Sequence, residues 1–159
     1  MAGNIYIEKA GADDSASLAV MVGELLGEIM NATGDRAFNF NLEETTARFR
    51  EFIERGRYFV LVARGAAGFE CGFVALYESY ALYAEGAFGT IPELYVRPEY
   101  RSRGIGHLLV EGAKAHGKER GWTRLEVTTP PLPQFDRTLA FYEREGFGVS
   151  GGRKLRILL

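Results

Sequence analysis

Apolar and polar positions alternate in some stretches of the chain and recur at helical spacing in others, and these two periods predict eleven elements. Alternation among β-branched and aromatic residues predicts seven short strands, and apolar residues three and four positions apart predict four helices. We expect strands at residues 4–9, 58–64, 71–77, 87–96, 124–128, 147–150 and 155–159, and helices at 13–30, 41–56, 104–120 and 138–145. The resulting order is β-α-α-β-β-β-α-β-α-β-β.

The connections between these elements indicate how the strands pair. Gly65 and Gly68 lie in a short turn that predicts a hairpin, and residues 78–85 extend it into a meander. The strand at 124–128 follows a helical crossover, so we expect it to run parallel to the strand at 87–96. The sequence thus predicts an α/β (α+β) fold, a single domain over residues 1–159, with a mixed, mostly antiparallel sheet of about seven strands and about four flanking helices.

Composition and charge narrow the class of protein. Hydrophobic residues make up 47% of the 159 and charged residues 25%, which excludes a disordered chain. Cys71 is the single cysteine and no apolar run is long enough for a membrane segment, so we expect a cytoplasmic protein without a disulfide. The formal net charge of −2 gives no reason to expect nucleic acid or a membrane as partner.

The charge is unevenly distributed along the chain. Residues 91–159 hold 12 Lys and Arg against 8 Asp and Glu, a net charge of +4. The remaining residues hold 7 against 13, a net charge of −6. The positive half favours an anionic ligand, although an ordinary solvated surface explains the imbalance equally well.

A glycine-bearing turn lies at residues 101–106, between the strand that ends in Leu94-Tyr95-Val96 and the helix that follows. Gly104 and Gly106 remove the Cβ atoms that would hold a ligand away from the backbone. The first N–H groups of the helix have no partner in the helix and carry its positive dipole end. With Arg101 and Arg103 beside them, they predict a site for phosphate or pyrophosphate.

Other interpretations of this region fit less well. A dinucleotide-binding fingerprint needs a third glycine where Leu109 stands. A phosphate loop at residues 112–119 lacks the Ser or Thr that binds magnesium, because Glu119 takes that place. An ordinary strand-to-helix connection with solvated arginines is the remaining alternative.

The motif Arg-x-x-Gly-x-Gly at Arg101 to Gly106 resembles the GNAT superfamily of N-acetyltransferases. A second mark, Phe141-Tyr142 followed by Gly146-Phe147, is similar to a pattern of the same family. The resemblance covers residues 91–147 and implies acetyl-CoA as co-substrate, and because the sequence contains no metal-ligand spacing we expect no metal. It also implies that the strand before the turn and the strand after the next helix splay apart, so that the pantetheine arm enters between them.

The resemblance assigns roles to the residues of this region. It implies that the turn binds the pyrophosphate and the preceding strand binds the pantetheine amides. Many members place an Asn before the Phe-Tyr pair, a contact that Asp136 or Thr138 is expected to replace here. The cofactor-binding set is Leu94, Tyr95, Val96, Arg101, Ser102, Arg103, Gly104, Ile105, Gly106, His107, Asp136 and Thr138.

Two residues are candidates for proton transfer. Glu93 is the carboxylate nearest the expected acetyl position and would take a proton from the attacking amine, with Glu126 as second choice. Tyr142 occupies the family's tyrosine position and would protonate the departing thiolate. The Tyr95 N–H is the expected donor to the thioester carbonyl. A surface role for Glu93 and a core role for Tyr142 are the alternatives.

The acceptor is expected to be the amine of a small molecule or peptide, and the sequence does not choose between them. Acidic residues, namely Glu28, Asp35, Glu78 and Glu85, favour a cationic amine, and the segment 35–41 resembles a loop that closes over a substrate. The alternative for this loop is that Phe38 and Phe40 pack into the core, as phenylalanine residues generally do. A non-catalytic acyl-CoA sensor, a different acyl group and a homodimer through the apolar residues of 155–159 remain open.

Overall fold

The computed structural model describes residues 4–159, and its internal contacts divide the chain into a unit of residues 1–128 and a unit of residues 129–159. Each unit is described by itself. The prediction of one domain over the whole chain therefore stays a prediction.

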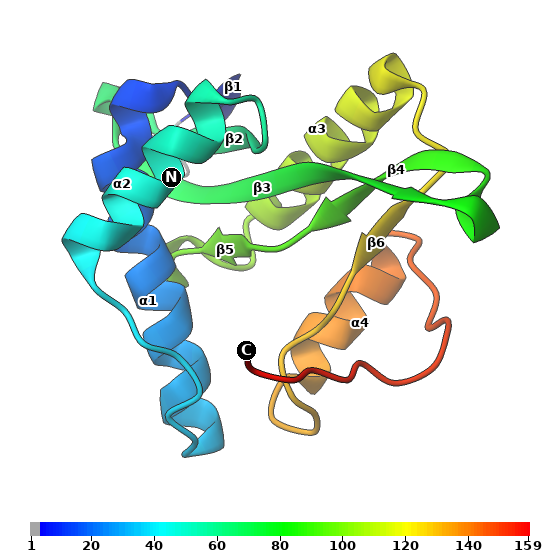
Figure 1. Ribbon diagram of the computed structural model, residues 1–159. Helices are drawn as coiled ribbons and strands as arrows, with labels where there is room; N and C mark the ends of the chain where they lie inside the picture. The colour runs from blue at the N-terminus through cyan, green and yellow to red at the C-terminus, as the bar shows by residue number, and fades with distance from the viewer. Residues whose placement is uncertain (1–3) are drawn as a thin grey trace. The chain divides into compact units, whose positions relative to one another are not determined.

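The first unit is built on a six-stranded sheet, which confirms the mixed, mostly antiparallel arrangement (Figure 1). The strands are β1 Tyr6–Lys9, β2 Phe59–Arg64, β3 Glu70–Ala81, β4 Gly86–Ile91, β5 Leu94–Val96 and β6 Leu125–Val127. The expected β2–β3 hairpin is present, and β3 extends beyond residue 77 to pair with β4. The expected parallel pair is also present, because β6 runs parallel to β4.

The stretch expected as one strand at residues 87–96 is broken into β4 and β5 at Pro92 and Glu93. Both strands pair with β3, but Thr90 lies opposite Tyr77 and Leu94 lies opposite Val74, so one extra residue is inserted between the two ladders. This is the two-against-one count of a β-bulge, which bends a strand. Proline fits here because it cannot donate to a ladder.

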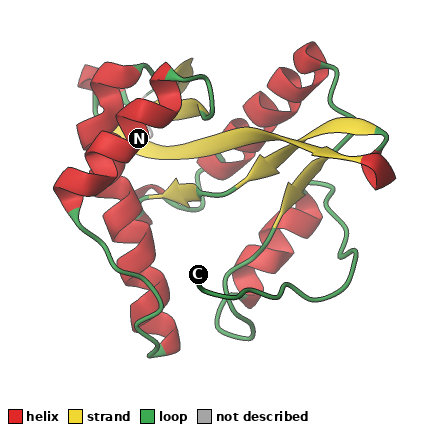
Figure 2. Cartoon of the chain, viewed as in Figure 1, coloured by secondary structure: helices red, strands yellow, loops and turns green. Residues whose placement is uncertain are grey.

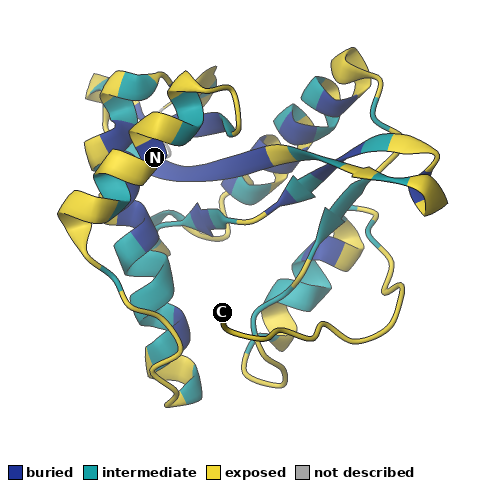
Figure 3. Cartoon of the chain, in the orientation of Figure 1, coloured by how far each residue is buried: buried dark blue, intermediate teal, exposed yellow. Residues whose placement is uncertain are grey.

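Helices cover both faces of the sheet (Figure 1). On one face lie α1 (Ser15–Thr33) and α2 (Leu42–Glu54), with a core that includes Leu18, Phe49 and Phe73. On the other face lies α3 (Ile105–Arg120), which contacts β2 and β3. Figure 3 shows the first half of β3 buried between these layers.

Local geometry explains where the helices begin and end, although α1 runs to Thr33, three residues beyond its predicted end at residue 30. The Asn41 side chain accepts a hydrogen bond from the Glu44 N–H at 2.9 Å, so it caps α2. Gly121 follows α3 with φ +74°, the left-handed conformation that glycine adopts without strain. Gly34 ends α1 in the same conformation, with φ +73°. In the described residues, no helix is both long and apolar enough to cross a membrane.

The second unit contains α4 (Asp136–Arg144), close to the predicted helix. The strands predicted at residues 147–150 and 155–159 are wrong, because this tail is irregular in the structure (Figure 2). Its apolar residues are exposed, with Leu155 at 92% and Ile157 at 84%. A strand needs a partner for its N–H and C=O groups, and an apolar run alone does not supply one.

Candidate active site

The turn before α3 has the backbone conformation of an anion site. Ser102 and Gly104 both have positive φ, +62° and +80°, and Gly104 is the N-cap of α3. Within the described chain, no backbone carbonyl accepts a hydrogen bond from the N–H groups of residues 102–106. Consecutive free N–H groups at a helix N-terminus form a concave, positively polarised site. The predicted phosphate turn therefore has the geometry that the motif implies.

The two arginines of the turn differ in what their guanidinium groups contact. Arg101 is paired with the carboxylate of Glu28 on α1, at 2.9 and 2.7 Å, and its Nε donates to the Val96 carbonyl at 2.8 Å. Arg103 lies over the ring of Tyr100 at 5.6 Å and has no carboxylate partner in the described residues. The positive charge of Arg101 is thus already balanced, whereas that of Arg103 is available to a ligand.

Strand β5 has one edge that no other strand of the described chain pairs. The Ala75 N–H donates to the Glu93 carbonyl at 2.9 Å and the Arg97 N–H to the Cys71 carbonyl at 2.8 Å. Because an antiparallel ladder alternates, the backbone groups of Tyr95 face β3 and those of Leu94 and Val96 face the open edge. The N–H groups that reach this edge are therefore those of Leu94 and Val96, whereas the Tyr95 N–H expected from the sequence faces β3.

Parallel pairing of β4 with β6 stops at Ile91 opposite Val127, immediately before the bulge. No pairing between β5 and β6 exists in the described residues. The splaying of the two strands that the resemblance implied is thus present, and its cause is the break at Pro92 and Glu93. Unpaired backbone groups on β5 are the groups that an amide-bearing ligand would satisfy.

Glu93 lies in this break, and its carboxylate accepts from the hydroxyl of Tyr58, which is 3.1 Å from both oxygens. Burial raises the pKa of Glu93 to about 7, and the Tyr58 hydrogen bond opposes that rise. A carboxyl group with a pKa near neutrality is suited to general base catalysis. The contact of Tyr58 with Glu93 could not be predicted from the sequence, because Tyr58 lies at the start of a predicted strand and belongs to no motif.

Tyr95 turns its side chain into the core toward α1. Its hydroxyl donates to Glu24 at 3.3 Å, and the same carboxylate is paired with Arg97 at 3.1 Å. Burial, followed by the nearby Glu24 charge, raises the pKa of Tyr95 to about 12. The Tyr95 side chain therefore anchors β5 to α1, and neither this side chain nor the Tyr95 backbone groups face the open edge.

The remaining predicted residues lie in the second unit, on α4. Tyr142 is buried and makes edge contacts with the rings of Phe141 and Phe147, at 5.2 and 5.4 Å. Burial raises its pKa, so the phenol is protonated at neutral pH. Asp136 is exposed in the first turn of α4 and Thr138 is half-buried in the same turn.

Several other candidates are engaged elsewhere. Glu126 forms an ion pair with Arg124 at 3.7 Å, which makes it a less suitable base than Glu93. Glu78 accepts from the hydroxyl of Tyr80 and from the Trp122 Nε1, and it pairs with Arg120; these contacts, that of Tyr80 first, lower its pKa. Glu78 therefore stabilises the packing of β3 with α3.

In the segment 35–41, Phe40 packs against α1 whereas Phe38 is exposed. The ring of Phe40 packs on Gly23 of α1 so closely that a Cβ at Gly23 would lie 2.6 Å from it. Phe38 remains 37% exposed. Phe40 is thus half-buried against α1, and neither phenylalanine belongs to the buried core.

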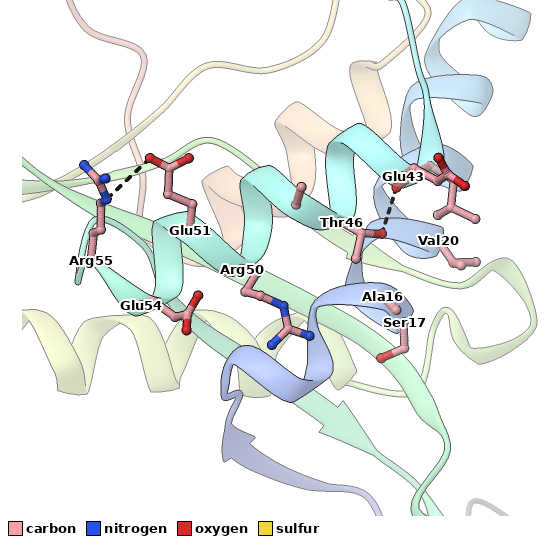
Figure 4. Close-up of a pocket in the computed structure, with 11 residues that line it drawn as sticks. Ala16, Ser17, Val20, Glu43, Thr46, Arg50, Glu51, Glu54 and Arg55 are labelled. Atoms are coloured by element: carbon pink, nitrogen blue, oxygen red, sulfur yellow. Dashed lines mark hydrogen bonds and ion pairs between the residues drawn. The ribbon is translucent and has the colours of Figure 1, made fainter.

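An open hollow lies on the outer side of the α1–α2 pair (Figure 4). Its lining includes Val20, Thr46 and Arg50, and none of the predicted site residues. Glu51 and Arg55 form an ion pair at its rim. We assign it no part in the chemistry.

The fold is that of known acetyltransferases. A ribosomal-protein-alanine N-acetyltransferase from Brucella melitensis biovar Abortus 2308 superposes with a TM-score of 0.73 at 19% identity, over 98% of this chain and 99% of that one. An aminoglycoside acetyltransferase from an uncultured soil metagenomic sample gives 0.76 at 17% identity, over 98% and 96%. A predicted acetyltransferase from Clostridium acetobutylicum, crystallised with acetyl-CoA, gives 0.77 at 17% identity, over 96% of each chain.

The sequence itself defines the family. Residues 54–149 match the family described as the acetyltransferase (GNAT) domain. The chain therefore belongs to the GNAT acetyltransferase family and is an N-acetyltransferase. A search of curated protein sequences finds no significant match.

Proposed function

We propose that the protein transfers an acetyl group from acetyl-CoA to a primary amine, by direct attack within a ternary complex. The observation that carries the proposal is the Glu93 carboxylate, held in the break between β4 and β5 beside an unpaired strand edge. A base and a binding edge for an amide-bearing ligand thus adjoin one another in sequence and in the sheet.

The chain offers two sets of groups that fit acetyl-CoA. The free N–H groups of residues 102–106, with Arg103, suit its pyrophosphate. The N–H and C=O groups of Leu94 and the N–H group of Val96 suit its pantetheine amides, and the Leu94 N–H is a donor available to a thioester carbonyl. When bound, acetyl-CoA supplies an activated acetyl thioester, so that a C–N bond forms with the amine and the C–S bond breaks.

Glu93 is the proposed general base. An amine is protonated at neutral pH and must lose a proton before it attacks, directly to a carboxylate or through water. Because the pKa of Glu93 is about 7, a large fraction is ionised at neutral pH and its basicity exceeds that of an ordinary carboxylate. Glu93 therefore accepts the proton that the acceptor releases.

Tyr142 is the proposed general acid. Its phenol is kept protonated by burial, and its hydroxyl makes no hydrogen bond within residues 129–159. A free phenolic O–H is able to donate to a departing sulfur. Tyr142 then recovers its proton from solvent after the product leaves.

The acceptor is a primary amine on a small molecule or a peptide. Similar structures include an aminoglycoside acetyltransferase and a ribosomal-protein-alanine N-acetyltransferase, which illustrate both classes. Glu28 and Glu78 are already paired with arginines, so of the four acidic candidates only Asp35 and Glu85 remain to attract a cation. We therefore place less weight on an acidic acceptor site than the sequence suggests.

Turnover with a panel of amines tests the proposal. The panel contains a polyamine, an aminoglycoside and a peptide with an N-terminal alanine, and the measurement is release of free thiol from acetyl-CoA. We expect amine-dependent, saturable release, reduced about a hundredfold or more in Glu93→Gln. Calorimetric binding of acetyl-CoA without thiol release from any amine would instead identify a sensor. Succinyl-CoA, run in parallel, tests the acyl group.

A further inference from the structure

The side-chain carboxylate of Glu93 has one hydrogen-bond partner among the described residues, and that partner is Tyr58. We propose that Tyr58 is a positioning residue: its hydroxyl holds the Glu93 carboxylate at the break between β4 and β5 and stabilises the charged form. This inference rests on the proposed function in one respect, the role of Glu93 as general base.

The position of the Tyr58 hydroxyl is fixed by the rings around it. Tyr58 stacks on Tyr77 of β3 at 6.3 Å with an interplanar angle of 10°. It also contacts Phe49 edge-on at 5.9 Å and Phe52 at 5.0 Å, both from α2. Three rings from two elements therefore restrict the ring of Tyr58, so its hydroxyl is directed without help from other polar groups.

The shared hydrogen bond fixes the carboxylate in turn. The Tyr58 hydroxyl lies 3.1 Å from each oxygen of Glu93, so it bridges the two. A carboxylate held through both oxygens has less freedom to rotate than one held through a single oxygen. Glu93 thereby keeps one orientation relative to the open edge of β5.

No charged side chain among the described residues stabilises the ionised form of Glu93. The rings packed around Tyr58 come from Phe49 and Phe52 of α2 and Tyr77 of β3, and none of them is charged. On α1, Glu24 is committed to Arg97 and Tyr95. Burial raises the pKa of Glu93 and the Tyr58 hydrogen bond lowers it, so these two effects set the balance.

The opposing effects of burial and of the Tyr58 hydrogen bond determine the protonation state of Glu93 at neutral pH. A hydrogen bond to an ionised group typically shifts its pKa by roughly one to two pH units. Without the Tyr58 hydroxyl, the pKa of Glu93 would rise from about 7 into a range where the group is mostly protonated at neutral pH. Tyr58 thus allows Glu93 to be buried and yet to act as a base.

The first test is the pH profile of kcat in Tyr58→Phe. The acidic limb reports the ionisation of Glu93, and we expect it to move upward by roughly one pH unit or more. Tyr77→Phe is the matched control, because it removes a hydroxyl from the stacked neighbour that donates no hydrogen bond to Glu93 in the described chain. An unmoved limb in folded Tyr58→Phe, or an equal movement in Tyr77→Phe, overturns the proposal.

The second test needs no turnover. The side-chain carboxyl carbon of Glu93, assigned with Glu93→Gln, is titrated by NMR in the wild type, Tyr58→Phe and Tyr77→Phe. A higher midpoint in Tyr58→Phe alone supports the role of Tyr58, and equal midpoints overturn it. Failure of the proposed function would look different, because thiol release would be absent while this titration still distinguished the variants.

Discussion

Gly72 of β3 lies so close to Tyr95 of β5 that a Cβ at Gly72 would be 2.4 Å from the Tyr95 carbonyl oxygen and 3.0 Å from the Val96 Cα. Both contacts are with backbone, which cannot rotate away as a side chain can. The narrow approach of these two strands therefore depends on a glycine, and β5 carries the open edge.

Gly72→Ala should displace β5 from β3. We expect unfolding to become easier by about 1–3 kcal/mol, because the added methyl group forces the backbone to move. Acetyl-CoA affinity should fall as well, since the open edge moves with β5. Thermal unfolding and calorimetric titration measure the two effects. Gly27→Ala is the control: no atom lies within 4 Å of its Cβ, so it should be neutral or slightly stabilising within α1.

Gly104→Ala separates cofactor binding from stability. Gly104 has φ +80° and open space around its Cβ, so the cost of alanine is backbone strain of about 1–2 kcal/mol. Gly121 at the other end of α3 has φ +74° and equally open space. Both alanine variants should lose similar stability, whereas only Gly104→Ala should bind acetyl-CoA more weakly. An equal loss of affinity in Gly121→Ala would argue against the turn as the binding site.

Arg103 and Arg101 should contribute unequally to cofactor binding. Arg103 has no carboxylate partner in the described residues, while Arg101 is paired with Glu28. We expect Arg103→Ala to weaken acetyl-CoA binding about tenfold at low salt, with a smaller loss for Arg101→Ala. Titrations at two salt concentrations measure both. The reverse ranking would show that Arg101 leaves Glu28 when the ligand binds.

Glu93→Gln should change the dependence of stability on pH. The folded-state pKa of Glu93, about 7, lies above its ordinary value of 4.5, so the folded protein binds more protons than the unfolded chain between these values. Stability therefore falls as pH rises through this window, by up to about 3 kcal/mol. Glu93→Gln should accordingly be more stable than the wild type at pH 8 and similar to it near pH 4. Denaturant unfolding at the two pH values provides the comparison, and an equal difference at both would contradict the buried, titrating carboxyl group.

Tyr142→Phe should slow turnover while preserving the buried ring. Tyr142 packs against Phe141 and Phe147, and phenylalanine keeps those contacts. If the phenol protonates the thiolate, we expect kcat to fall about a hundredfold. Rapid-mixing measurements of thiol release determine kcat, and circular dichroism checks the fold. Undiminished turnover would remove Tyr142 from the chemistry.

Features encoded by neighbouring residues were predictable from the sequence. The phosphate turn and the predicted boundaries of the helices that begin near Asn41 and Gly104 depend on residues a few positions apart. The break at Pro92 was not predicted, because the apolar pattern runs on through residues 87–96. Proline within a predicted internal strand was the available signal.

Features that depend on strand register could not be predicted from the sequence. Tyr58 and Glu93 are 35 positions apart and meet because both adjoin strands that pair with β3. The tail at residues 155–159 shows the opposite error. Its apolar residues suggest a strand, but the structure has no strand there and these residues are almost fully exposed. Periodicity reports which faces are apolar, and only pairing decides which strands exist.

The contact between Phe40 and Gly23 helps to determine which residues of the α1–α2 connection tolerate substitution. The segment that joins α1 to α2 is fixed at one end by the left-handed Gly34 and at the other by the Asn41 cap, with the Phe40 ring locked onto α1. The residues between these anchors, 35–39, are exposed and form no part of the core. Mutations can therefore accumulate there without loss of folding, so a library randomised over these five positions tests whether this segment contacts the acceptor.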